Sequence, residues 1–121
     1  MANAAIFIGW GQAVSGREQQ ALQVFQEAVQ YWTRLQQQGA IEGFEPIALE
    51  PHGGELAGCC LIKGDRQQLS QLRYSDEWQR LNARAEVVVT HFGMVDAHIG
   101  EGLQRLFGEF QRASAELGGQ G

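Results

Sequence analysis

The chain has 121 residues, 44% apolar and 19% charged, which is the composition of one ordinary globular domain. Its formal net charge of −5 argues against partners that need a cationic face, namely nucleic acid and anionic membrane surfaces. No apolar run approaches the ~20 residues of a membrane-spanning helix, and the N-terminus lacks the basic and apolar regions of a secretory signal.

The first half of the chain predicts a strand, a helix and a second strand. Residues 4–10 are nearly all apolar, which is typical of a central strand buried on both faces. Ser15 to Glu18 has the pattern of a capping box, and the helix that it starts should end near Gln38. Pro46 cannot donate a ladder hydrogen bond, so the strand expected over 41–50 should be an edge strand or carry a bulge.

The helix expected after Ser15 has a wide apolar stripe that includes Leu22 and Phe25, and we expect this stripe to be buried. The adjacent Cys59 and Cys60 do not make a disulfide framework, so reduced thiols in the cytoplasm are the simplest interpretation. They should point to opposite faces of their strand, where both are expected to be packing residues.

The second half repeats the order of the first. Residues 56–63 are again apolar on both faces, which predicts a second central strand. Asp65 and Ser75 are good helix N-caps, so we expect two short helices, over 65–73 and 76–84.

A fourth strand is expected over 86–95, which is β-branched at its start, and a last amphipathic helix begins at Gly100. We expect residues 1–117 to form one domain and 118–121 to be a disordered tail.

Two interleaved strand–helix–strand units predict an α+β, ferredoxin-like βαββαβ fold with an antiparallel four-strand sheet in the order 4-1-3-2. In this fold the second helix would be broken and the helix from Gly100 would be an addition. The paired helices cover one face of the sheet, and the other face still needs a cover. The last helix can hide part of that face, and a second copy of the sheet is the other obvious cover.

This order of elements, with its extra C-terminal helix, resembles the dimeric α/β-barrel superfamily, and in particular small uncharacterised bacterial proteins of that kind. The segments that carry the resemblance are Gly16-Arg17-Glu18, Pro51-His52-Gly53-Gly54 and Ser75-Asp76-Glu77-Trp78. The resemblance implies a homodimer in which two sheets pair face to face. The superfamily includes cofactor-free monooxygenases of the antibiotic-biosynthesis type and small ligand-binding domains, but no catalytic signature is present here.

Aromatic residues at strand and helix ends are the main candidates for a ligand site, because such residues can line an apolar pocket between a sheet and its helices. The same residues could instead belong to the core or to a dimer interface. The candidates are Trp10, Phe44, Tyr74, Trp78 and Phe92.

Polar candidates are fewer. Arg17 stands where a phosphate-binding loop has its lysine, but Glu18 follows it and would repel phosphate, so only a small anion or carboxylate is expected there. His52, in a glycine-rich turn, and His91, on the expected fourth strand, are candidates for a general base. The histidines lack the spacing of metal ligands, and we expect no metal and no cofactor.

Three functions remain open at this stage. The chain could bind a small apolar or aromatic molecule beside the sheet, with Trp10, Phe44, His91 and Phe92 as lining and Arg17 or His52 as polar anchor. It could be a cofactor-independent monooxygenase or isomerase with His52 or His91 as base. It could also be a structural dimer without a ligand.

Overall fold

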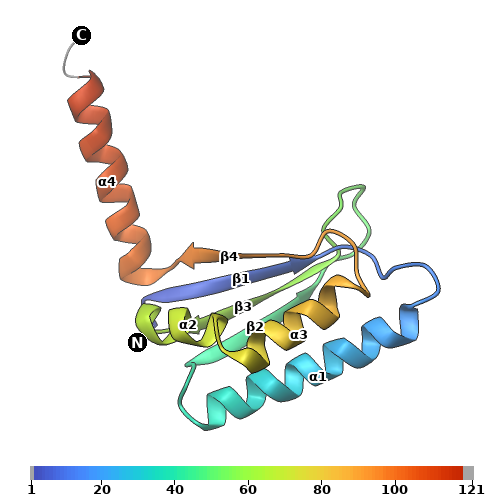
Figure 1. The fold of residues 1–121 in the computed structure, drawn as a ribbon. Helices are drawn as coiled ribbons and strands as arrows, with labels where there is room; N and C mark the ends of the chain where they lie inside the picture. The colour runs from blue at the N-terminus through green and yellow to red at the C-terminus, as the bar shows by residue number, and fades with distance from the viewer. Residues whose placement is uncertain (1, 119–121) are drawn as a thin grey trace.

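The computed structural model describes residues 2–118 and shows a sheet with three helices on one of its faces (Figure 1). The elements in chain order are β1 (Ala4–Trp10), α1 (Glu18–Gln37), β2 (Gly43–Ala48), β3 (Gly58–Gly64), α2 (Arg66–Arg73), α3 (Asp76–Glu86), β4 (Gly93–His98) and α4 (Gly100–Gly118). None of the helices within the described residues combines the length and apolarity needed to cross a membrane.

The four strands pair in the order β2-β3-β1-β4, and every pairing is antiparallel. This confirms the predicted ferredoxin-like α+β fold with its order 4-1-3-2. β1 and β3 are central, as their continuous apolar runs indicated. Pro46 lies on the edge strand β2, opposite Cys60, where its missing N–H removes no bond from the interior of the sheet.

The core lies between the sheet and the helices α1, α2 and α3. Ile6 and Ile62 face each other on the central strands, and both are fully buried together with Leu69 and Trp78. Each such side chain stabilises the fold by roughly 1.5–3 kcal/mol through removal of apolar surface from water. Side chains alternate along a strand, so the same strands also present a second set to the opposite face.

That opposite face, which we call the open face, carries Phe7, Ile47, Leu61 and Val95 by strand alternation and pairing register. Ile47 and Val95 are 39% and 58% exposed. α1, α2 and α3 all lie on the other side of the sheet (Figure 1). The open face therefore has no helix cover from the first three helices.

The two cysteines are free thiols on opposite faces, as predicted. Cys60 belongs to the core beneath the helices and has no exposed surface. Burial raises the pKa of the Cys60 thiol to about 12. Cys59 is its neighbour on the open-face side and is 8% exposed.

Two of the three predicted side-chain N-caps are confirmed. The Asp65 carboxylate accepts hydrogen bonds from the backbone N–H groups of Gln67 and Gln68. The Ser75 hydroxyl accepts one from the N–H of Trp78. These caps satisfy N–H groups that the first turn of a helix leaves without partners.

The predicted capping box at Ser15 is wrong. Gly16 has a φ of +87°, so the chain turns sharply after Ser15 and Arg17 takes the N-cap position without a side-chain cap. The Glu18 carboxylate accepts from the N–H of Gly16 at 3.0 Å. The pattern was correct about the place of the helix start and wrong about the hydrogen bonds that form it.

The predicted fourth strand over 86–95 is displaced. α3 continues to Glu86, and β4 begins only at Gly93. Between them, Val88 accepts a backbone hydrogen bond from Val14 at 2.8 Å. His91 has a φ of +53°, a left-handed conformation that an extended strand does not contain. The β-branched residues before His91 therefore pair with the loop after β1 instead of entering the sheet.

α4 does not hide the open face, in contrast to the sequence-based expectation. Figure 1 shows α4 leaving the end of β4 and pointing away from the other helices, and no residue of α4 is buried. Gly118, assigned to the tail, is the last residue of α4. Residues 119–121 lie outside the described part of the chain.

Candidate functional site

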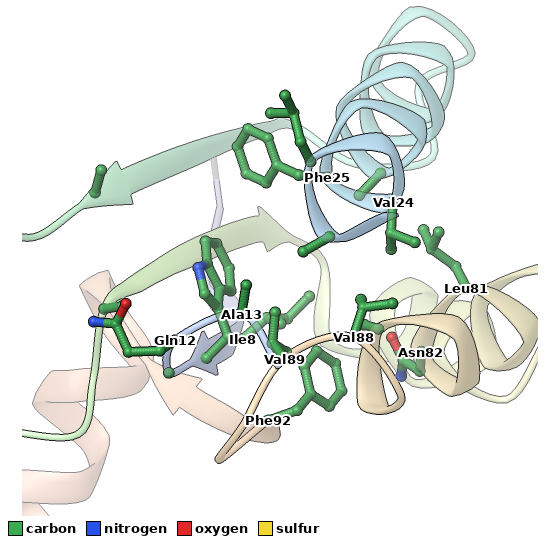
Figure 2. A pocket seen from close by; sticks show the side chains of 18 of the residues that line it. Ile8, Gln12, Ala13, Val24, Phe25, Leu81, Asn82, Val88, Val89 and Phe92 are labelled. Atoms are coloured by element: carbon green, nitrogen blue, oxygen red, sulfur yellow. The ribbon is translucent and has the colours of Figure 1, made fainter. Parts of the chain in front are cut away.

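An apolar cavity of about 410 Å³ lies between the sheet and the helices α1 and α3, beside the end of β1. In Figure 2, side chains from α1 (Val24, Phe25), from α3 (Leu81, Asn82) and from the segment before β4 (Phe92) surround this space. The residues that line it are Ile8, Trp10, Gly11, Gln12, Ala13, Ala21, Leu22, Val24, Phe25, Ala28, Tyr31, Trp32, Ala48, Ala57, Trp78, Leu81, Asn82, Ala85, Val88, Val89 and Phe92.

The local sequence explains why space is left here. Alternation along β1 places Ile8 and Trp10 on the helix side of the sheet. The facing helices contribute small side chains at Ala21, Ala28 and Ala85, where longer aliphatic residues would fill the space. Protein interiors are otherwise close-packed, so small side chains at these three positions leave a cavity that neighbouring side chains do not fill.

Several aromatic side chains that line the cavity pack against one another. The rings of Trp10 and Phe25 lie 5.9 Å apart at an angle of 60°. The rings of Tyr31 and Trp78 meet almost edge to face, 6.2 Å apart at 74°. Edge-to-face pairs are a favourable arrangement of aromatic quadrupoles, and they hold the rings in fixed orientations.

The lining residues carry no formal charge at neutral pH, and Gln12, Tyr31 and Asn82 are its polar side chains apart from the indole N–H groups. Burial raises the pKa of Tyr31 above its ordinary value, and the opposing hydrogen bond with Ser75 is the smaller effect. The tyrosine hydroxyl therefore stays neutral over the physiological range. A cavity with these walls favours neutral, largely apolar contents.

The Sδ atom of Met94 contacts two polar side-chain groups of α3. The indole N–H of Trp78 donates to the Sδ atom of Met94 at 3.2 Å, and the Nδ2 group of Asn82 approaches the same sulfur at 3.6 Å. Met94 lies on β4, so this contact ties α3 to the edge of the sheet. It also holds the amide of Asn82 in place at the cavity wall.

The mouth of the cavity lies at the start of α1. Leu22 is 58% exposed and Phe25 is 37% exposed, although both line the cavity. The prediction that these two residues are buried is wrong, because the stripe of α1 turns toward a cavity with an opening instead of a closed core. Gln12 is also exposed at this end.

Three of the aromatic candidates meet in the cavity wall: Trp10, Trp78 and Phe92. Phe44 lies outside it and packs against Trp32, with ring centroids 5.8 Å apart. Tyr74 also lies outside and is 68% exposed.

The polar candidates do not line the cavity. Arg17 donates from Nη1 to the carbonyl of Val87 at 2.6 Å and so joins the start of α1 to the end of α3. The Nε2 atom of His52 lies 2.9 Å from the carbonyl oxygen of Leu56, within its own loop. His91 is exposed, and its Nε2 atom lies 3.3 Å from the carboxylate of Glu55.

Sequence reasoning did not select Ala21, Ala85, Asn82 or Val89 for the site. Small residues on the inner stripes of two facing helices were the available signal, but the same pattern is usual where helices pack closely. Across residues 2–118, no group of three or more His, Cys, Asp or Glu side chains is arranged to hold a metal ion.

No protein-family model and no curated protein sequence matches the chain. Solved structures do match its fold. A dimeric protein of unknown function and ferredoxin-like fold from Bacteroides fragilis is 11% identical, with a TM-score of 0.58 over 79% of this chain and 96% of that one.

Two further structures are similar at 11% identity and a TM-score of 0.55, over 82% of this chain and 95% of theirs. One is SnoaB, a cofactor-independent oxygenase from Streptomyces nogalater, and the other is a conserved protein from Methanosarcina mazei. These likenesses show that the chain has the ferredoxin-like fold. Since this fold serves many functions, activity has to be argued from the cavity itself.

Proposed function

We propose that the chain binds a small, neutral, largely apolar molecule in the cavity between the sheet, α1 and α3. The observation that carries this proposal is an open cavity of about 410 Å³ whose lining residues include no charged side chain. Binding sites for small molecules are typically apolar clefts of ~300–1,000 Å³ with a few polar groups. The cavity lies within that range.

The chemistry of the walls selects the ligand class. A charged ligand would lose its hydration on entry and would meet no opposite charge among the lining residues. An aromatic ligand would instead pack against Trp10, Phe25 and Phe92, which line the same space. The amides of Gln12 and Asn82 are suited to orient one hydroxyl or carbonyl group.

The fold likeness to a cofactor-independent oxygenase makes an enzyme the second candidate. Such a function would need a group that takes a proton from the substrate. Neither His52 nor His91 lines the cavity, and Tyr31, which does, is held in its neutral form by burial. Binding is therefore better supported than base catalysis. Oxygen consumption on addition of a bound ligand would favour the oxygenase.

We also propose that the chain forms a homodimer through the open face. Four apolar side chains of the strands, Phe7, Ile47, Leu61 and Val95, have no helix over them in one copy. Exposed apolar patches of this kind mark interaction surfaces. The Bacteroides fragilis protein of the same fold is described as dimeric. The two free thiols suit the reducing conditions of the cytoplasm.

The ligand proposal is tested by a thermal-shift comparison of 1-naphthol with 1-naphthoate, two aromatic molecules of similar shape that differ in charge at pH 7. At a concentration about 100-fold above the dissociation constant, a ligand adds about 2.7 kcal/mol to stability. We expect 1-naphthol to raise the melting temperature by about 5 °C or more at such a concentration. 1-Naphthoate should have little effect.

The matched variants are Ala85→Leu, which fills the cavity, and Ala83→Leu, which lies on the exposed side of the same helix. The shift caused by 1-naphthol should disappear in Ala85→Leu and persist in Ala83→Leu. Equal stabilisation by the neutral and the anionic compound, or a full shift in Ala85→Leu, would contradict the proposal.

A further inference from the structure

α4 carries an apolar stripe that no element among residues 2–118 buries. Leu103, Phe107, Phe110 and Leu117 are 37%, 57%, 65% and 80% exposed, and no residue of this 19-residue helix is buried. Their spacing of three, four and seven residues places them on one side of the helix. Helical stability in proteins comes mainly from packing of such a stripe, so α4 is incomplete in a single copy.

The connection between β4 and α4 is short and closely packed. β4 ends at His98 and α4 begins at Gly100, so Ile99 alone connects them. Gly100 has a φ of +54°. At Gly102 a side-chain Cβ would lie 2.6 Å from the carbonyl oxygen of Asn3, so the helix passes directly against the chain in front of β1.

With this connection, α4 lies away from its own sheet. A helix of this length extends ~28 Å, and among the regular elements its substantial contacts are with β4. Figure 1 shows it pointing away from α1, α2 and α3. Phe107, Phe110 and Leu117 therefore remain exposed among the described residues, and a second molecule could cover them.

The area available favours a partner that covers more than α4. Phe107 and Phe110 each expose on the order of 100 Å², and the whole stripe offers on the order of 400 Å². A standard stable interface buries ~800 Å² on each partner. The apolar side chains of the open face add the further surface that such an interface needs.

Charge also favours a second copy. With a net charge of −5, two copies repel each other unless they meet where charge is balanced. On the open face the strands carry Lys63 and Glu45, whose charged groups lie 3.8 Å apart. Along α4, Arg112 pairs with Glu109 at 2.6 Å. The open face therefore combines apolar side chains with a compensated pair of charges, and α4 carries one such pair as well.

We propose that α4 is an arm that packs its apolar stripe onto the open face of a second copy of this chain, while the α4 of that copy packs back in the same way. A two-fold axis makes the two contacts identical, which is the usual symmetry of a homodimer. The inference rests on the homodimer proposed above and adds that the sheets alone do not complete it.

Sedimentation equilibrium of the full chain tests the arm. The double variant Phe107→Gln/Phe110→Gln should raise the dimer dissociation constant by at least ~30-fold, the effect of losing an interface hot spot. The control Arg105→Gln/Glu116→Gln changes exposed residues on the opposite side of α4, keeps the net charge, and should leave the constant unchanged. Val95→Lys, on the open face, should also weaken the dimer.

The two proposals fail in different ways. If Val95→Lys weakens the dimer and the phenylalanine variant does not, the homodimer stands and the arm is wrong. If the unmodified chain is monomeric at 100 µM, on the order of a weak dissociation constant, both are wrong.

Hydrogen exchange provides a second measurement that does not depend on a variant folding. The amides of α4 should become protected as the protein concentration rises through the dimer dissociation constant. Protection of α4 in a monomer would show that its own chain covers it. Recruitment of a monomer to phosphatidylcholine vesicles through α4 would assign the stripe to lipid. Either result would overturn the arm.

Discussion

The two faces of the sheet contrast sharply, although the same strands form both. On the helix side, Ile6 and Ile62 are fully buried beneath α1, α2 and α3. On the open face, Ile47 and Val95 remain 39% and 58% exposed. The helix side is completed within one chain and holds the cavity. The open face and α4 are completed, in our account, only by a second copy.

The difference shows that apolar runs such as residues 4–10 serve two purposes. A strand with apolar side chains on both faces must have both faces covered. The fold provides three helices for one face and directs the fourth away from the other (Figure 1). If this division is correct, substitutions on the helix side should cost more stability than substitutions on the open face.

The largest effect should come from the helix side. Trp78 is 1% exposed and forms both a wall of the cavity and part of the core, so Trp78→Ala should cost about 3–5 kcal/mol of unfolding free energy. Tyr74→Ala, at a position that is 68% exposed, should change it by less than about 0.5 kcal/mol. Urea denaturation measures both. Similar losses in the two variants would remove the distinction between core and surface.

A moderate effect is expected from alkaline pH. The pKa of Cys60 is raised by burial to about 12 in the folded state, whereas an unfolded cysteine titrates near ~8.5. The stabilising contribution of the neutral thiol is thus fully present below pH ~8.5. It is lost as pH rises toward 12, at about 1 kcal/mol per pH unit, because the unfolded chain releases a proton that the folded chain retains.

Denaturation between pH ~8.5 and ~9.5 isolates this contribution, because tyrosines ionise mainly above that range. Cys60→Ala should flatten the pH dependence there. A slope that survives in Cys60→Ala would show that another group is responsible.

Substitutions on the open face should affect association, and they should have little effect on the stability of the monomer. Val95→Lys should change the stability of the monomer by less than about 0.5 kcal/mol, because the side chain is already 58% exposed. At high protein concentration the same variant should melt below the unmodified chain, since it loses the stabilisation that association gives. Melting curves at 2 and 200 µM, concentrations on the order of those that separate weak dimers from monomers, measure both effects. Identical curves for the two proteins at both concentrations would count against the open-face dimer.

The smallest effects should come from the polar candidates outside the cavity. Arg17, His52 and His91 do not line it, so alanine at each position should change the affinity for 1-naphthol by less than about twofold, within the range of surface substitutions. Tryptophan fluorescence of Trp10 and Trp78 reports the binding. A loss of affinity above tenfold in either histidine variant would restore that histidine as a site residue.

The sheet order could be predicted because several independent signals agreed. Two continuous apolar runs indicated the central strands, and Pro46 indicated an edge. The caps at Asp65 and Ser75 were equally local, since each depends on one side chain and the next turn of backbone. Patterns that act within a few residues were sufficient for these features.

The displaced fourth strand and the direction of α4 could not be predicted in this way. The strand begins late because His91 adopts a left-handed conformation, which its sequence neighbours do not indicate. α4 leaves the sheet at a point where Gly102 lies against Asn3, a contact between residues far apart in the chain. The start of β4 and the direction of α4 both involve contacts between distant residues, and the periodicity of the sequence does not indicate such contacts.

The cavity was predicted only in part. Trp10, Trp78 and Phe92 were selected as aromatic residues and do line it. The alanines that create the space, such as Ala28 and Ala85, were not selected, because an alanine on a helix is equally compatible with close packing. A cavity depends on which small residues meet across two elements, and this needs the structure.

The central claim is that the cavity between the sheet, α1 and α3 holds a neutral apolar ligand, and calorimetric titration with 1-naphthol tests it most directly. We predict one site per chain, a negative heat-capacity change from burial of apolar surface, and loss of binding in Ala85→Leu with retention in Ala83→Leu. Equal binding by these two variants would contradict the claim.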